Sequence, residues 1–354
     1  MNGVMKGRGA SINPAGRFER SRRESVDDGW YQEPVPDSVA TEVRPEAARS
    51  VISHNDSPDI PFTQSINPYR GCEHGCIYCY ARPSHAYINL SPGIDFETRL
   101  LYKADAGRVL RAELARPAYR CEPIMLGANT DPYQPVEKRL GVTREILEVL
   151  LETRHPVSVI TKGTLILRDL ALLQELAAMN LTRVTVSLTT LDPELKRTLE
   201  PRAASPQARL RVISELARGG VPVSVLAAPM IPAVNDAELE QLLEAAAAAG
   251  ATRAGYVLLR LPHEVKDLFR AWLEEHLPLR AAHVMSLVQQ ARGGRDNDPR
   301  FGMRMRGTGP WAEMLRARFE LARKRLGLNA ERSPELDTGR FCPPRGHGQL
   351  ELAW

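Results

Sequence analysis

The sequence predicts an α/β fold built as a partial barrel of parallel strands, a (β/α)6 arrangement. Short β-branched runs alternate with amphipathic stretches from about residue 62 onward, in units of roughly 30 to 40 residues, and the alternation stops near residue 265. Strands separated by helices in this way pair in parallel through right-handed crossovers. Six strands are too few to close an eight-fold barrel, so we expect an open one.

Each element has its own local signal. The expected strands are short apolar or β-branched runs at 64–69, 123–128, 157–161, 183–188, 221–227 and 254–261. The expected helices between them lie at 104–115, 144–153, 167–179 and 206–218, and a further one begins at Asp236 as its N-cap and ends at Gly250. Two glycines, Gly219 and Gly220, end the helix at 206–218.

The chain divides into three parts on this basis. Residues 1–60 carry scattered Pro, Gly, Ser and charge without a period, and we expect a poorly ordered extension that covers an edge of the sheet. Residues 61–264 form the barrel core. Residues 265–354 form a C-terminal extension with helices at 265–277 and 312–326, separated by a loop rich in Gly, Arg and Asn.

Composition excludes several protein classes. The 354 residues are 43% hydrophobic and 25% charged, which is ordinary for a globular protein and excludes collagen, coiled coil and wholesale disorder. The longest mostly apolar run, 221–234, contains three prolines and is shorter than the roughly 20 residues of a membrane helix. The N-terminus is polar and Arg-rich without an apolar h-region. We therefore expect a cytoplasmic protein that makes no membrane contact.

Positive charge is concentrated near the C-terminus. The net charge is only +4, but ten Lys or Arg face four Asp or Glu between Arg292 and Arg325, whereas the first fifty residues are balanced. This basic segment, 292–325, suits either contact with phosphate or nucleic acid, or a solvated basic face.

Three of the five cysteines, Cys72, Cys76 and Cys79, lie within eight residues in the run NPYRGCEHGCIYCYAR. Clustered thiols in a reducing compartment bind metal more often than they form disulfides. Zinc needs four protein ligands, and His74 is the available fourth, although it lies where the loop must turn. A four-iron cluster on three thiolates instead leaves one iron open to substrate or cofactor. An electron-transfer ferredoxin-like module would require a fourth thiolate.

The cysteine run resembles the signature of the radical S-adenosylmethionine (radical SAM) superfamily. The shared features are the spacing Cys-x3-Cys-x2-Cys, the aromatic Tyr78 before the third cysteine, and the position at the end of the first strand. The resemblance implies a [4Fe-4S] cluster whose open iron chelates S-adenosylmethionine, reductive cleavage of that cofactor, and hydrogen abstraction from a substrate. It also implies an electron donor such as flavodoxin or ferredoxin.

Several longer runs are similar to the spore-photoproduct-lyase-like branch of this superfamily. They are YARPSHAYINLSPGIDFE, NTDPYQPVE, ITKG, EPRAASPQAR and APMIPAVND, and the resemblance covers roughly residues 60 to 350. One departure matters. In the lyase itself a cysteine at the end of the second strand donates hydrogen, but the matching stretch here, LGANTD, has none. Cys121 lies at the other end of that strand. Cys342 stays open as a donor, because a C-terminal tail can fold over a barrel mouth. The departure counts against photoproduct repair.

The resemblance assigns roles to polar residues at the carboxyl ends of the strands, where the active site of such a barrel lies. Asn129, Thr130 and Asp131 are placed for the amino group of the cofactor. Lys162 is placed for its carboxylate, and Ser187 for its ribose or carboxylate. Thr189 shares the role of Ser187. The remaining candidates are Tyr78 for adenine, Arg202 for an anion, Glu200 as a partner of Arg202, and His85, Tyr87 and Asp95 on the substrate side. His155, before Pro156, is interpreted as structural.

Two functions follow from different features. The first is a radical SAM enzyme of unidentified substrate, for which DNA, RNA, a protein side chain and a small metabolite are all open. The second is a zinc-stabilised nucleic-acid-binding protein that uses the basic segment and carries out no radical chemistry.

Overall fold

The computed structural model describes residues 7–19, 39–331 and 334–344. Its main sheet has seven strands in the order β10-β9-β8-β7-β6-β3-β2. The strands are β2 (Ile52–His54), β3 (Gln64–Ile66), β6 (Ile124–Leu126), β7 (Val157–Thr161), β8 (Thr182–Ser187), β9 (Val223–Met230) and β10 (Arg253–Leu258). All neighbours pair in parallel except β2, which runs antiparallel to β3. The predicted partial barrel of six parallel strands is confirmed, with β2 added at its edge.

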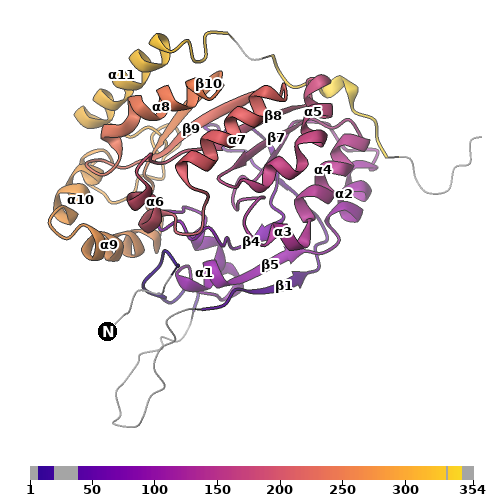
Figure 1. Ribbon diagram of the computed structural model, residues 1–354. Helices are drawn as coiled ribbons and strands as arrows, with labels where there is room; N and C mark the ends of the chain where they lie inside the picture. The colour runs from indigo at the N-terminus through magenta and orange to yellow at the C-terminus, as the bar shows by residue number, and fades with distance from the viewer. Residues whose placement is uncertain (1–6, 20–38, 332–333, 345–354) are drawn as a thin grey trace, which may run out of the picture.

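Helices cover the outer face of this sheet (Figure 1). They are α2 (Ala106–Leu114), α4 (Val142–Glu152), α5 (Leu170–Ala178), α7 (Pro206–Arg218), α8 (Leu239–Ala248) and α11 (Gly309–Arg325). Alternate residues of β7 and β8 are buried, as are residues three and four apart on the helices. The helices and strands together enclose one large hydrophobic core, in which each fully buried aliphatic side chain contributes about 1.5–3 kcal/mol.

A second, smaller sheet lies beside the barrel mouth. It consists of β1 (Glu42–Glu46), β5 (Arg99–Lys103) and β4 (Tyr69–Arg70), in the order β1-β5-β4. The sequence predicts one strand from residue 64 to 69, but the chain leaves the main sheet after Ile66. Asn67 causes this change, because its side-chain oxygen accepts the amides of Asn129 and Thr130, at 2.8 and 3.3 Å, in place of a further ladder.

The described part of the N-terminal extension differs from the poorly ordered segment that we expected. β1 pairs with β5 over five residues and β2 pairs with β3, so β2 does cover an edge of the main sheet. Residues 8–10 are buried against the helix α1 (Ile94–Thr98). The division at residues 60 and 264 stays a proposal.

Other elements also depart from the sequence prediction. Asp236 does not cap a helix. It lies in the 3-10 turn η3 (Asp236–Glu238), and its carboxylate accepts the Trp311 indole N–H at 2.8 Å. The remaining elements are η1 (Arg82–Ile88), α3 (Glu137–Leu140), η2 (Leu165–Asp169), α6 (Pro193–Leu199), α9 (Val265–His276), α10 (Ala281–Gln290) and η4 (Thr338–Arg340). Among the described residues, no helix is long and apolar enough to cross a membrane.

The C-terminal loop between α10 and α11 bridges the open side of the barrel. The sheet ends at β10 on one side and at β2 on the other. The amide of Leu258 in β10 donates to the carbonyl of Met305 at 3.0 Å. Arg304, next in the chain, binds Asp59 in the loop between β2 and β3, with Nε 2.8 Å from Oδ2. This loop therefore joins the two edges that the strands leave apart.

Candidate iron-sulfur and cofactor site

The cysteine loop, residues 71–81, follows β4 at the carboxyl ends of the parallel strands. Backbone hydrogen bonds fix it at several points: Cys72 N donates to Phe96 O at 2.9 Å, Ile77 N to Leu199 O at 3.0 Å, and Cys79 N to Cys76 O at 3.2 Å. Gly71 and Gly75 have φ of 79° and 67°, a conformation that side chains with a Cβ rarely adopt. The loop is thus held open in a turn by its backbone.

The three thiols of this loop are left for a ligand. Cys72 and Cys76 are buried, and no side chain in the described part of the chain hydrogen-bonds any of the three. Burial raises the pKa of all three thiols, that of Cys76 to about 12, although the amides of His74, Ala81 and Arg82 oppose the increase at Cys72 and Cys79. Bound cationic iron would reverse this shift, because thiolates are its preferred ligands. The donor set fits an iron-sulfur cluster.

A site for a single metal ion such as zinc requires several ligands that converge on one point. Among the residues that the structure describes, no three His, Cys, Asp or Glu side chains converge as ligands of one metal ion. His74, the fourth ligand of the zinc interpretation, is directed to Asp131, with Nδ1 3.4 Å from Oδ2. In an iron-sulfur cluster each thiolate binds a different iron, so the sulfurs need not meet at one point.

Arg82 and Glu97 support the cysteine loop from within. Both side chains are fully buried, and they form an ion pair of 2.5 Å. Arg82 also donates to the carbonyls of Gly75, at 3.2 Å, and Cys76, at 2.9 Å. The Glu97 carboxylate accepts the amides of Gly9 and Ala10, each at 2.9 Å. The pair thereby joins the cysteine loop to the N-terminal segment 8–10.

Tyr78 is the centre of a buried polar network. Its hydroxyl donates to Glu200 and lies 3.2 Å from the hydroxyl of Thr189, which donates to the same carboxylate oxygen at 2.7 Å. Glu200 also forms an ion pair with the fully buried Arg209. Burial would raise the pKa of Glu200, but Arg209 and Lys162 lower it to about 2. The carboxylate therefore stays ionised beside the cysteine loop.

Lys162 and Ser187 meet at the ends of β7 and β8. Lys162 Nζ donates to Ser187 Oγ at 2.9 Å, and it lies 4.0 Å from Glu200 and 5.9 Å from the centre of the Tyr78 ring. These contacts bring three predicted cofactor contacts, Tyr78, Lys162 and Ser187, into one cluster beside Cys76.

Asp131, which follows β6, organises the adjoining strand ends. Its carboxylate accepts Thr161 Oγ1 and the Lys162 amide, both at 2.7 Å. Burial would raise its pKa, but His74 and these hydrogen bonds lower the pKa to about 2. Asn129 is half-buried beside it, whereas the Thr130 hydroxyl donates to Tyr69 O at 2.8 Å. The Thr130 side chain is thus committed to the fold.

Arg202 lies apart from the Lys162 cluster. Its guanidinium donates to Glu73 at 3.0 Å, and its backbone amide donates to His74 O at 3.2 Å. Glu200 does not pair with it, contrary to the sequence interpretation. The partner of Glu200 is Arg209, which no sequence motif marks, because its position on α7 is that of an ordinary helix residue.

The substrate-side candidates do not form a common site. His85 is buried, stacks edge-on to Phe96 and lies with Nε2 3.0 Å from Arg99 O. Tyr87 is 69% exposed, and Asp95 accepts the Ser91 amide at 3.0 Å. His155 is buried against Tyr119 and Phe341, in keeping with a structural role.

Acidic partners occupy much of the basic segment 292–325. Arg292 is buried and donates to backbone carbonyls of residues 258, 259, 303 and 304. The remaining pairs are Arg300 with Asp298, Arg304 with Asp59, Arg318 with Glu240, Arg323 with Glu320 and Arg325 with Glu244. Six of the ten cationic side chains of the segment are thus bound to other groups of the fold, whereas Arg295, Arg306, Arg316 and Lys324 are exposed.

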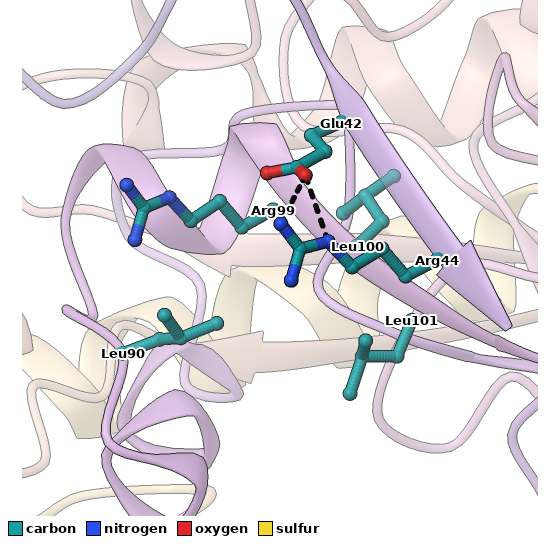
Figure 2. A pocket seen from close by; sticks show the side chains of 6 residues that line it. All are labelled: Glu42, Arg44, Leu90, Arg99, Leu100 and Leu101. Atoms are coloured by element: carbon teal, nitrogen blue, oxygen red, sulfur yellow. Dashed lines mark hydrogen bonds and ion pairs between the residues drawn. The ribbon is translucent and has the colours of Figure 1, made fainter. Parts of the chain in front are cut away.

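One cavity lies away from these groups. It has a volume of about 210 Å³ and lies on the small sheet, where Glu42 and Arg44 of β1 pair beside Arg99 of β5 (Figure 2). None of the predicted site residues lines it.

Comparisons with known proteins agree with this geometry. Residues 66–246 match the family model of the radical SAM superfamily. An uncharacterised protein of Mycobacterium tuberculosis is 42% identical over 221 residues, 62% of this chain and 65% of that protein. An uncharacterised protein of Methanocaldococcus jannaschii is 27% identical over 173 residues, covering 49% and 62% respectively. The chain therefore spans somewhat less than two thirds of the curated relatives that it matches.

Solved structures share the fold. A point mutant of spore photoproduct lyase superposes with a TM-score of 0.57 at 15% identity, covering 81% of this chain and 80% of the lyase. The lyase complexed with a dinucleoside spore photoproduct superposes with a TM-score of 0.50 at 14% identity, covering 67% and 66%. At such identity the likeness concerns the fold alone.

Proposed function

We propose that this chain, which belongs to the radical SAM superfamily, is an enzyme that holds a [4Fe-4S] cluster on Cys72, Cys76 and Cys79. The observation that carries the proposal is the cysteine loop itself: three thiols without side-chain partners among the described residues, on a backbone fixed at the mouth of a parallel barrel. When bound, the cluster supplies one electron that cleaves S-adenosylmethionine to methionine and a 5′-deoxyadenosyl radical, which abstracts hydrogen from substrate.

The surrounding residues bind and orient the cofactor in this proposal. Lys162, held by Ser187 and facing the ionised Glu200, offers an ammonium group to the cofactor carboxylate. Asn129 and the strand end fixed by Asp131 face the amino group. Tyr78, whose hydroxyl is bound by Glu200 and Thr189, presents its ring or main chain to adenine. Arg202 remains a candidate for anion contact only from the outer side of the cysteine loop.

Reconstitution under anaerobic conditions tests this function. Protein loaded with iron and sulfide, then given dithionite and S-adenosylmethionine, is expected to release 5′-deoxyadenosine. Cys72→Ala, Cys76→Ala and Cys79→Ala should each abolish that release and lower bound iron. Cys121→Ala, at the opposite end of β6, is the matched control and should behave as wild type. Stoichiometric zinc without iron, or a loaded cluster that never cleaves the cofactor, would contradict the proposal.

We further propose nucleic acid as the substrate class, because of Arg260 at the barrel mouth. This residue follows β10, and its guanidinium lies 5.3 Å from the centre of the Tyr80 ring. Its Nε is buried without a hydrogen-bond partner among the described residues, and its terminal nitrogen reaches only the sulfur of Met305 at 3.8 Å. The guanidinium groups of Arg82 and Arg292, by contrast, donate hydrogen bonds to backbone carbonyl groups.

A phosphate would supply the acceptor that Arg260 lacks. Tyr80 directly follows Cys79, is 47% exposed, and is anchored through its hydroxyl to the carbonyl of Ala128. Proteins that bind single-stranded nucleic acids use a cationic side chain for the phosphate and an exposed aromatic ring on which the base stacks. The mouth therefore supports an unpaired nucleotide as the group that reaches the cofactor.

Binding of labelled single-stranded DNA and RNA tests the substrate class. In anisotropy measurements on the cluster-loaded protein, Arg260→Met is expected to weaken binding about tenfold, because a hydrogen bond to a charged group contributes roughly 1.5–3 kcal/mol. Arg295→Met, an exposed arginine of the basic segment, is the control and should change binding little. Equal binding by both variants, or no binding by wild type, would contradict nucleic acid as the substrate.

A further inference from the structure

A groove of about 610 Å³ lies on the outer side of the cysteine loop. Four segments that are distant in sequence line it: the start of β1, the cysteine loop, α3 and the loop after α6. Its lining residues are Thr41, Val43, Glu73, Pro135, Val136, Lys138, Arg139 and Arg202. It is separate from the cluster of Tyr78, Lys162 and Ser187.

The groove is positively charged. Lys138, Arg139 and Arg202 contribute three cations, and Glu73 is its one carboxylate among the described residues. Glu73 is 5% exposed and is already bound by Arg202 at 3.0 Å and by the Thr41 hydroxyl at 2.8 Å. Two exposed cations, Lys138 and Arg139, therefore remain uncompensated by the lining of the groove.

The short helix α3 presents these two cations because the residue before them is anchored inward. Glu137 is fully buried, accepts Arg168 at 2.7 Å and the Thr143 amide at 3.0 Å, and is bound by the Tyr69 hydroxyl. Neither Lys138 nor Arg139 has an ion-pair partner within the described residues, in contrast to most arginines of the basic segment. Their charge is available to a partner.

The groove also lies next to the thiols. Glu73 follows Cys72 in the chain, and its amide donates to Gln134 Oε1 at 2.8 Å. Gln134, which precedes the lining residue Pro135, donates in turn to Gly71 O at 3.2 Å. Both neighbours of Cys72 are thus bonded to Gln134, the buried residue that precedes the lining residue Pro135. Because electron transfer weakens steeply with distance, it matters that a donor docked in this groove would contact Glu73, the residue next to Cys72.

We propose that this groove docks the acidic face of a small one-electron donor protein and that electrons enter the cluster past Cys72. The inference rests on the proposed function, since it assigns an entry side to the electron that the cluster needs. In the step itself one electron leaves the reduced prosthetic group of the donor, which is oxidised, and reduces the cluster; no bond forms or breaks. The barrel mouth stays free for substrate.

A comparison of two reductants tests the docking surface. Flavodoxin, kept reduced by its reductase and NADPH, serves as the acidic protein donor, and dithionite serves as a reductant that needs no docking surface. The variant is Lys138→Glu/Arg139→Glu in the full-length, cluster-loaded protein. The matched control is Arg316→Glu/Lys324→Glu, which makes the same charge change on exposed residues of α11, on the opposite side of the molecule in Figure 1.

We expect flavodoxin-driven formation of 5′-deoxyadenosine to fall about tenfold or more in Lys138→Glu/Arg139→Glu at low salt, because electrostatic steering raises association rates by roughly 10- to 1000-fold. The dithionite-driven rate and the iron content should stay within about twofold of wild type. In wild type and in the α11 control, the flavodoxin-driven rate should decrease as salt rises from about 20 to about 200 mM, and in the α3 variant this dependence should largely disappear.

Several results would overturn the docking surface. An unchanged flavodoxin-driven rate would do so, and so would an equal loss with both reductants, which indicates a structural role. The docking surface would also be overturned if dithionite activates the wild-type protein but neither flavodoxin nor ferredoxin reduces it. Failure of dithionite with wild type would instead contradict the proposed function, so the two proposals fail separately.

Discussion

The cysteine loop 71–81 and the basic segment 292–325 both carry dense clusters of chemically active residues, yet the fold treats them in opposite ways. In the cysteine loop the backbone is held by hydrogen bonds while the three thiols have no side-chain partners among the described residues. In the basic segment six of the ten cationic side chains bind carboxylates or backbone carbonyls. A cluster of residues indicates a ligand when its reactive groups remain uncommitted.

The two regions also differ in how their ion pairs are placed. Behind the cysteine loop, Arg82 and Glu97 are fully buried, as are Arg209 and Glu200 beside Tyr78. In the basic segment the pair between Arg318 and Glu240 is partly exposed, at 26% and 33%. Removing one partner of a buried pair leaves a buried charge, whereas solvent replaces the partner in an exposed pair.

The largest expected effect is therefore at Glu97. Glu97→Gln keeps the shape but leaves the Arg82 guanidinium buried without its counter-charge, and we expect a loss of about 3–5 kcal/mol in the free energy of unfolding. Urea titration of the cluster-free protein measures it. Glu240→Gln is the matched substitution in a pair of the basic segment and should cost less than about 1 kcal/mol. Similar costs for the two variants would refute the contrast.

Acid should act on two buried histidines, His85 near the cysteine loop and His155 before β7, at the opposite ends of the strands. Burial lowers the pKa of His85 and of His155 to about 4, against about 6.5 in an unfolded chain. Between these values the unfolded chain binds more protons, so the free energy of unfolding falls as pH falls. The expected loss from about pH 7.5 to about pH 5 is about 2 kcal/mol for each histidine.

Two measurements on the cluster-free protein check this pH dependence. In urea titrations at both pH values, His85→Gln should remove about half of the loss. Hydrogen exchange at the lower pH should rise first around η1 and α1, which hold and contact His85. The basic segment contains no histidine and should lose protection later. The opposite order of protection loss would count against the prediction.

A smaller effect is expected where the N-terminal segment rests on the cysteine loop. A Cβ at Gly9 would lie 1.8 Å from the carbonyl oxygen of Gly75, so Gly9→Ala must displace one of the two backbones. We expect a cost of about 1–3 kcal/mol, typical of overpacking, and a shorter lifetime of the loaded cluster in air. Gly255→Ala, whose Cβ would meet only the side chain of Leu226 at 3.3 Å, is the control. Equal cluster lifetimes would show that the contact is dispensable.

The smallest effect is expected at Arg318. Arg318→Met removes a partly exposed pair on α11 and should change the free energy of unfolding by less than about 1 kcal/mol. Urea titration measures the cost, and release of 5′-deoxyadenosine should be unaffected. A cost of several kcal/mol would mean that the basic segment is as critical as the buried pairs at the cysteine loop.

The strands and helices of the barrel were predictable because each is determined by residues within its own segment. The strand at 157–161 and the helix at 206–218 have the predicted bounds, since alternation and a capping serine with a following proline define them within the segment itself. The small sheet was missed, because β1 and β4 have two to five residues each and are held only by pairing with β5.

The same distinction applies to the site: its local motif was predictable from the sequence, and its contacts between distant segments were not. The spacing of Cys72, Cys76 and Cys79 was readable because a motif lies within one loop. The network around Tyr78 was not, since Glu200 and Arg209 come from a different part of the chain and look like surface charges in a helical context. The outward direction of Arg202 likewise depends on Glu73, 129 residues away.

The contact of residues 8–10 with Gly75 and Glu97 has a consequence for maturation. The N-terminus leaves the ribosome first, but the carboxylate that receives it is made 87 and 88 residues later. Assembly machinery that inserts iron and sulfide needs access to the same loop that this segment covers. If the proposed cluster is bound, its insertion and the closure of segment 8–10 over the loop would therefore compete.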